Sequence, residues 1–142
     1  SPSPSPSPSP SLPRAPVDRS LTLLARADAE RQAADTRAAR ATLLEVRQKY
    51  PRGTGAPQAA FDLGVVAFDV EHDFAAAARW FRLYLDEAPR GPLAREALGR
   101  VMEAESRSGD LAGASAAAAR YLELYPGGPH ASLAKRLVAQ HP

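Results

Sequence analysis

The sequence contains no cysteine, and this absence excludes several kinds of chemistry within its 142 residues. Disulfide bonds, zinc sites built on thiolates, cysteine nucleophiles and lipid-anchoring cysteines are all ruled out in this stretch. The sequence also lacks an apolar run of about 18 residues, the length that a membrane-spanning helix requires. The chain begins with Ser1, not methionine, which indicates a fragment or a processed product, so a signal peptide, lipoprotein anchor or transmembrane helix could precede it.

Lysine is scarce, with only Lys49 and Lys135, so arginine supplies nearly all of the positive charge. Aspartate and glutamate are interspersed among the arginines, and the formal net charge is only +2. This mixture is typical of solvated helix faces and speaks against a basic stripe for nucleic acid. Isoleucine is absent, and no segment alternates β-branched with polar residues. Alanine, leucine, arginine and glutamate dominate instead, which predicts an all-α fold.

The first 17 residues differ from the rest, because they open with SPSPSPSPSP and stay rich in proline. Proline at every second position removes half of the backbone donors and favours an extended polyproline II conformation. We expect residues 1–17 to be a linker, disordered or in polyproline II, that acts as a spacer of about 30 Å. Two other interpretations are a Pro-rich ligand and a set of serines that are phosphorylated before proline.

A short motif that contains proline occurs three times in the remaining chain. Successive prolines are separated by 38 and 37 residues, and each follows an aspartate by 16 residues. An aspartate before an apolar-periodic stretch is a favourable N-cap, and a proline after that stretch ends the helix. Each interval therefore predicts one capped helix. The aspartates are Asp35, Asp73 and Asp110, and the prolines are Pro51, Pro89 and Pro126.

Apolar residues recur at helical spacing over residues 18–142, which predicts one domain of helical repeats. A single hairpin cannot bury its own apolar face, so we expect an α-solenoid of about three stacked hairpins and a C-terminal capping helix. Residues 18–50 alternatively form one long helix, because QAADTRAA has no glycine or proline, but the register of Asp35 favours a hairpin. The predicted helices span about 18–33, 36–50, 57–71, 74–88, 92–107, 111–125 and 129–140.

Small residues are expected on the packing side of the first helix of each hairpin. They lie 13 and 6 residues before each capping aspartate, which places them at matching depths. A small side chain lets a neighbouring helix approach closely. These pairs are Thr22 with Ala29, Ala60 with Ala67, and Ala97 with Ala104.

The second helix of the middle hairpin contains Ala77, Phe81 and Tyr84 and is followed by Pro89. These residues stand at the offsets of the alanine, aromatic, small residue and proline of the tetratricopeptide repeat (TPR), which this helix resembles. The phrase YP-x-G-x-x-A-x-x-A is most similar to repeats of bacterial cell-envelope proteins. Those proteins include the Tol-Pal-associated division coordinator, outer-membrane assembly lipoproteins and the C-terminal repeats of FecR-like or anti-sigma regulators.

The resemblance implies a concave surface, lined by the first helix of each hairpin, that binds a peptide segment of a partner. On this chain the positions expected on that surface are apolar, and one interpretation is an apolar groove that binds a partner segment. The other interpretation is that the helix phase is off by one position and that the same residues are core between repeats. A third is that the Pro-rich N-terminal segment folds into the groove. The candidate partner-binding residues are Phe61, Val65, Phe68, Leu98 and Met102.

The three histidines give no sign of a metal site or of catalysis. His72, His130 and His141 form no helical i, i+4 pair with another ligand. The RGTGAP segment has neither the strand nor the Lys-Ser/Thr pair of a phosphate loop, and no serine lies in a G-x-S-x-G elbow. We therefore expect no catalytic residue, no metal and no cofactor.

Together these patterns predict a non-enzymatic scaffold for protein or peptide partners, with no nucleic acid and no membrane insertion within this stretch. The resemblance implies the bacterial cell envelope, on the periplasmic side. One alternative is an extracytoplasmic or soluble output domain of a membrane-bound transcriptional regulator of the FecR-like or anti-sigma kind, and the alternative compartment is the cytoplasm. Another is a self-association module that pairs through the alanine-rich helix from Leu111 to Tyr125.

Overall fold

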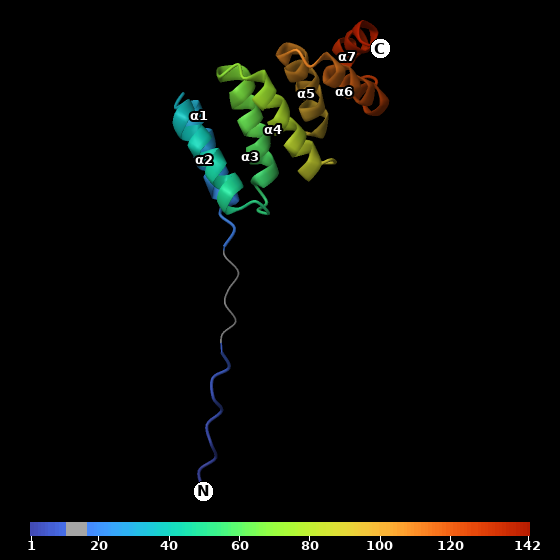
Figure 1. Ribbon diagram of the computed structural model, residues 1–142. Coiled ribbons are helices and arrows are strands. Elements are labelled where there is room, and N and C mark those ends of the chain that lie inside the picture. The colour runs from blue at the N-terminus through green and yellow to red at the C-terminus, as the bar shows by residue number, and fades with distance from the viewer. Residues whose placement is uncertain (11–16) are drawn as a thin grey trace.

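The computed structural model describes residues 1–10 and 17–142. Over these ranges the chain is all-α and has no strand (Figure 1). Residues 1–10 are exposed and lie outside any helix, and the part of the predicted linker at residues 11–16 lies outside the described residues. The helices are α1 (Ser20–Gln32), α2 (Thr36–Lys49), α3 (Ala56–Val65), the π-helical segment η1 (Val66–Val70), α4 (Phe74–Glu87), α5 (Ala94–Ser108), α6 (Leu111–Leu124) and α7 (Ala131–Gln140).

The helices follow one another in space in the order of the chain, from α1 at one side to α7 at the other (Figure 1). Each packs chiefly against the helices directly before and after it. Residues 18–50 form two helices, so the predicted first hairpin is confirmed over the single long helix. The outer side of α7 exposes Lys135, Arg136 and Gln140, which suits a helix at the end of the series.

The three hairpin turns share one geometry. In each, the predicted aspartate caps the second helix by accepting a hydrogen bond from the backbone N–H three residues later, at 2.9–3.1 Å. The residue before the aspartate has a positive φ, which is 58° at Ala34, 53° at His72 and 89° at Gly109. The first two turns therefore hold a side chain in a left-handed conformation that glycine adopts more easily. The capping residues are Asp35, Asp73 and Asp110.

The joints between hairpins also repeat, and they explain the recurring Tyr/Ala-Pro-x-Gly phrase. In each joint the glycine N–H donates to the carbonyl three residues earlier at 2.9 Å, and the glycine carbonyl accepts from the alanine three residues later at 3.0–3.1 Å. These two tight turns place the next helix beside the one just ended. The glycines are Gly53, Gly91 and Gly128, and the alanines are Ala56, Ala94 and Ala131.

A buried tyrosine fixes the second joint and the third. The Tyr84 hydroxyl accepts a hydrogen bond from the backbone N–H of Leu93, and Tyr121 does the same for His130, both at 3.0 Å. At the first joint Val46 holds the tyrosine's position, and the hydroxyl of Ser20 accepts from the N–H of Gly55 at 2.8 Å instead. A hydroxyl therefore satisfies a backbone donor at every joint.

The predicted small residues are buried in the second and third units but not in the first. Ala60, Ala67, Ala97 and Ala104 are at most 2% exposed. In the first unit the prediction is wrong, because Thr22 and Ala29 are exposed and α1 buries Ser20 and Ala27 in their place. Within the described residues, the terminal helix α1 packs chiefly against α2 and α3. The aspartate that caps α2 therefore does not determine which face of α1 is buried.

The buried side chains form two hydrophobic clusters, one between α1, α2 and α3 and the other from α3 to α7. Trp80 of α4, the single tryptophan, packs against both clusters and so contributes to the contact between them. Phe81, one position further along, is fully buried. Its ring would meet a Cβ on Gly64 at 2.8 Å, so α3 and α4 approach closely only because Gly64 has no side chain.

Candidate functional site

A row of mostly polar side chains occupies one face of α3 and η1. Gln58, Asp62, Val65 and Asp69 recur at intervals of four, three and four residues, which is the spacing of one helix face. The Gln58 amide donates to the Asp62 carboxylate at 2.9 Å. This face turns away from the core, because Ala60, Leu63 and Ala67 of the same helical stretch are buried.

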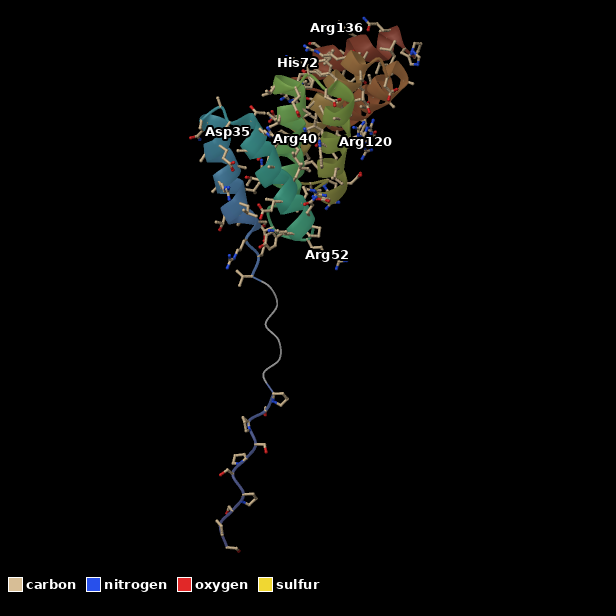
Figure 2. All side chains as sticks on the ribbon, turned by 60° about the vertical axis from the view of Figure 1, so that its left-hand side comes forward. Asp35, Arg40, Arg52, His72, Arg120 and Arg136 are labelled. Atoms are coloured by element: carbon tan, nitrogen blue, oxygen red, sulfur yellow. The ribbon has the colours of Figure 1, made fainter. Side chains whose placement is uncertain are left out.

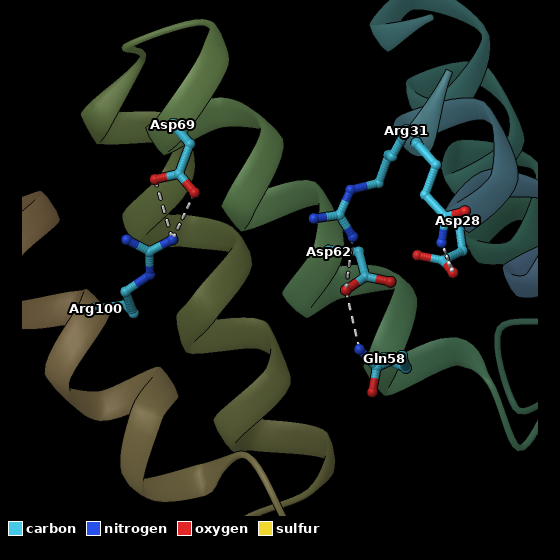
Figure 3. A network of polar contacts seen from close by, with 7 residues as sticks. Asp28, Arg31, Gln58, Asp62, Asp69 and Arg100 are labelled. Atoms are coloured by element: carbon cyan, nitrogen blue, oxygen red, sulfur yellow. Dashed lines mark hydrogen bonds and ion pairs between the residues drawn. The ribbon is translucent and has the colours of Figure 1, made fainter. Parts of the chain in front are cut away.

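Ion pairs connect this face to the helices on both sides (Figure 3). Arg31 of α1 lies 3.6 Å from the Asp62 carboxylate, and Arg100 of α5 donates to both oxygens of Asp69 at 3.1 and 3.2 Å. A further carboxylate on α1, that of Asp28, accepts from Gln32 at 3.1 Å. The first helices of the three hairpins thus share one charged surface, which we call the polar face.

Asp62 is the electrostatically perturbed group of the polar face. Burial raises the pKa of its carboxyl, because a partly desolvated carboxylate is penalised. The hydrogen bond from Gln58 and the charge of Arg31 favour the ionised form but do not cancel the effect of burial. A hydrogen-bond donor from a ligand would therefore stabilise the ionised form of this carboxylate.

The guanidinium groups of α5 cover the aromatic rings below the polar face. Arg100 lies 4.6 Å from the centroid of the Phe68 ring, and Arg107 lies 5.2 Å from it. Cations at this distance are attracted to the negative face of the ring. Phe68 is consequently shielded from solvent, at 6% exposure, by two arginines of the neighbouring hairpin.

A cleft of about 360 Å³ opens beside the polar face, between the end of α1 and the α3–η1 stretch. Its apolar side consists of Val65, Val66 and Val70, and Val70 is 55% exposed. The cleft coincides with the π-helical segment, where Glu71 N–H donates to the Val66 carbonyl at 3.1 Å. Single π-helical turns are frequent at functional sites. The charged residues that line the cleft are Asp28, Arg31 and Asp69.

The structure buries four of the five candidate residues from the sequence. Phe61, Phe68, Leu98 and Met102 are at most 8% exposed and belong to the core, and Val65 alone lines the cleft beside the polar face. Phe61 stacks edge-on against Phe81 at 5.2 Å. This arrangement agrees with the other interpretation of the same residues, in which the helix phase is off by one position. Asp62 and Asp69, one step after the two phenylalanines, lie on the outer face instead.

The sequence contains a signal that identifies the polar face. Asp62 and Asp69 are seven residues apart, which is nearly two full turns, so the two charges must share one side of the helix. Ala60 and Ala67 have the same spacing and lie two positions earlier, about 200° around the helix axis. The side opposite the small residues is therefore the polar one.

The histidines are scattered over the described part of the chain. His72 is exposed in the α3–α4 turn, His130 lies at the start of α7 with its Nε2 3.3 Å from Glu103, and His141 is exposed after α7. Among the residues that the structure describes, no three His, Cys, Asp or Glu side chains gather closely enough to hold a metal ion. None of the helices in these ranges is both long and apolar enough to cross a membrane.

Comparison with known proteins identified no relative of this chain. No protein-family model matches the chain, and no curated protein sequence matches it.

Proposed function

We propose that this protein is a non-enzymatic scaffold that binds a segment of a partner protein on the polar face. The cleft beside Val65, Val66 and Val70 is the observation that carries the proposal. It combines an apolar surface with carboxylates and a guanidinium group at its edge, which is the usual composition of a peptide site. In this proposal the apolar side chain of a partner enters the cleft, and a basic residue beside it meets Asp28 or Asp69.

The same proposal treats the chain as a TPR-like solenoid of three hairpins with a capping helix. The repeated joints and turns support it, because the same hydrogen bonds recur at three places along the chain. Packing of each helix on its sequence neighbours supports it as well. A stack of this kind presents the first helices of successive hairpins side by side, which is how the polar face arises.

We place the scaffold in the bacterial cell envelope, on the periplasmic side. Support for this compartment comes from the resemblance of the Tyr-Pro phrase to repeats of envelope proteins. The Ser-Pro alternation of residues 1–10 suits a spacer that holds a domain away from its attachment point. Fractionation of the source cells tests the compartment directly, and recovery of the protein in the cytoplasmic fraction alone would contradict it.

The binding proposal is tested by a single charge placed in the cleft. Val70→Arg changes an exposed side chain, so the fold should be retained, which circular dichroism checks. The matched control is Leu111→Arg, because Leu111 is similarly exposed, at 52%, but lies at the start of α6. We expect an envelope extract to yield a partner with the parent and with Leu111→Arg, and none with Val70→Arg. Equal capture by both variants would reject the cleft as the binding site.

Self-association is the second candidate. The alanine-rich helix α6 leaves Leu111, Ala112, Ala116 and Ala119 exposed, and these residues could meet a second copy. Light scattering separates the two candidates, because a scaffold that acts alone has the mass of one chain at all concentrations. A dimer that is lost in the Leu111→Arg variant would favour self-association.

A further inference from the structure

The first joint between hairpins is closed by an ion pair. Arg47, near the end of α2, donates to both carboxylate oxygens of Glu87, near the end of α4, at 2.6 and 2.8 Å. The same guanidinium donates to the carbonyl of Ala56 at the start of α3, at 3.1 Å. The Arg47 side chain is only 14% exposed. It therefore fills the space between the three helix ends.

The second joint has leucines at the positions of this ion pair. Arg47 lies four residues before Pro51, and Leu85 lies four residues before Pro89. Glu87 lies two residues before Pro89, and Leu124 lies two residues before Pro126. Ala56 likewise corresponds to Ala94, five residues after the proline. Two leucines cannot bridge the helix ends as an arginine and a glutamate do, so the space at the second joint is left open.

A groove occupies that space. It is a cleft of about 650 Å³ whose apolar surface includes Pro89, Ala94, Leu124 and Tyr125. An adjoining pocket of about 250 Å³ shares these residues and extends the groove to Leu85 and Leu98. Leu124 is 47% exposed, although leucine is usually buried. The volume is sufficient for at least one large apolar side chain of a ligand.

Arginines line this groove beside its apolar residues. Arg90, Arg95 and Arg120 line it, against two acidic residues, Asp86 and Glu96. Arg120 projects from α6 into solvent (Figure 2), and its ion pair with Glu123 is long, at 3.9 Å, with both side chains more than 60% exposed. Exposed pairs of this kind contribute little and are easily exchanged. The excess of guanidinium groups around an apolar surface is complementary to carboxylates.

We propose that the groove at the second joint binds an extended acidic peptide, with one large apolar side chain on Leu85, Ala94 and Leu124 and flanking carboxylates on Arg90, Arg95 and Arg120. This site is separate from the polar face, because it lies where α4 and α6 end and α5 begins, and it shares no lining residue with the cleft beside Val70. Either site can fail its test without affecting the other.

The test uses three fluorescein-labelled peptides and the full chain, with binding followed by fluorescence polarisation. The probe has the sequence Glu-Glu-Leu-Phe-Glu-Glu, and the matched control replaces each glutamate by lysine. The third peptide is the chain's own Ser-Pro segment, residues 1–10. We expect the acidic peptide to bind at least tenfold more tightly than either of the others, with an affinity that falls as salt is raised. Equal binding of the lysine peptide, or tighter binding of the Ser-Pro peptide, would overturn the proposal.

The structure supplies a variant that closes the groove. Leu85→Arg with Leu124→Glu transfers the ion pair of the first joint to the second, and we expect it to weaken the acidic peptide at least tenfold. The reciprocal change, Arg47→Leu with Glu87→Leu, opens the first joint, but Pro57 and Leu83 stand there at the positions of Arg95 and Arg120, so we expect the stoichiometry to stay at one peptide. Unchanged affinity in a folded closing variant would reject the groove.

A second measurement keeps the proposal testable if the closing variant does not fold. Arg95→Ala and Arg120→Ala alter exposed side chains and should each weaken the acidic peptide by at least threefold. The matched control is Arg79→Ala, which removes an exposed arginine from α4 that does not line the groove. Equal effects of all three variants would mean that the peptide responds only to overall charge. A dimer in light scattering that Leu124→Glu abolishes would assign the groove to a second copy instead.

Discussion

The hydroxyl of Tyr84 accepts a hydrogen bond at 3.0 Å from the backbone N–H of Leu93, nine residues later and at the start of the next hairpin. Tyr121 and His130 repeat this relationship at the following joint. The donors belong to the N-cap positions of α5 and α7, where helical N–H groups lack partners within the helix. A side chain of one repeat therefore completes the backbone of the next.

Removal of that hydroxyl should weaken the stack without disturbing the core. We expect Tyr84→Phe and Tyr121→Phe each to lower the free energy of unfolding by about 1 kcal/mol, because a partly buried N–H loses its acceptor. Urea denaturation measures the change. Tyr50→Phe is the control, since the hydroxyl of Tyr50 has no partner among the described residues, and a loss as large as that of Tyr84→Phe would contradict this account.

The adjacent glycines 127 and 128 provide a matched pair of substitutions. A Cβ on Gly128 would collide with the hydroxyl of Tyr121, whereas a Cβ on Gly127 has nothing within 4 Å. We expect Gly128→Ala to cost about 1–3 kcal/mol by overpacking, and Gly127→Ala to be neutral or to stabilise by up to about 1 kcal/mol through the unfolded chain. Similar thermal midpoints for the two variants would show that the tyrosine contact does not set the requirement for glycine.

The left-handed residues of the hairpin turns predict a stabilising substitution. Ala34 has a φ of 58° and Gly109 has one of 89° at the same position of another turn. A residue with a Cβ pays about 1–2 kcal/mol for this conformation. We therefore expect Ala34→Gly to raise the free energy of unfolding by about 1 kcal/mol, and Gly109→Ala to lower it by a similar amount. Changes of the same sign in both variants would be inconsistent with a shared turn geometry.

Asp62 makes the stability of the protein depend on pH. Burial holds its pKa in the folded state above the ordinary value of 3.8, so the folded state binds the proton more tightly than the unfolded state does. The stability contribution of this group is therefore greatest at low pH and falls as pH rises from 3.8 through the folded pKa. We expect Asp62→Asn to be more stable than the parent at pH 7 and the difference to shrink toward pH 4. A difference that stays constant over this range in urea melts would contradict the prediction.

The element order could be predicted from the sequence because its signals are local. Asp35, Asp73 and Asp110 are each followed at 16 residues by a proline, and cap and stop signals of this kind act within a few residues of themselves. The π-helical turn of η1 could not be predicted, because it ends the helix and no residues follow in the same helix to show the change of phase. The exposed face of α1 could not be predicted either, because it depends on which neighbours a terminal helix lacks.

The candidate site was harder to predict, because a helix turns by about 100° at every residue. Moving from Phe61 to Asp62 is enough to pass from the core to the polar face. The contacts of Phe61 with Phe81 and Tyr84 show that this side chain belongs to the core, and the spacing of the apolar residues alone did not show it. The closed first joint depends on a contact between residues 40 positions apart, and no local pattern in the sequence reveals it.

The identical hydrogen bonds at the three joints have a consequence for how such a chain can grow. Residues 89–125 begin and end at equivalent points of the repeat. A second copy of this segment inserted after Tyr125 would therefore form, at both of its ends, the same turn that already connects the units. The length of the protein is therefore a quantity that gene duplication can change by whole units, with no new connection to evolve. A longer descendant would inherit one more joint, and the side chains four residues before its proline and two residues before the following proline would decide whether that joint is open or closed.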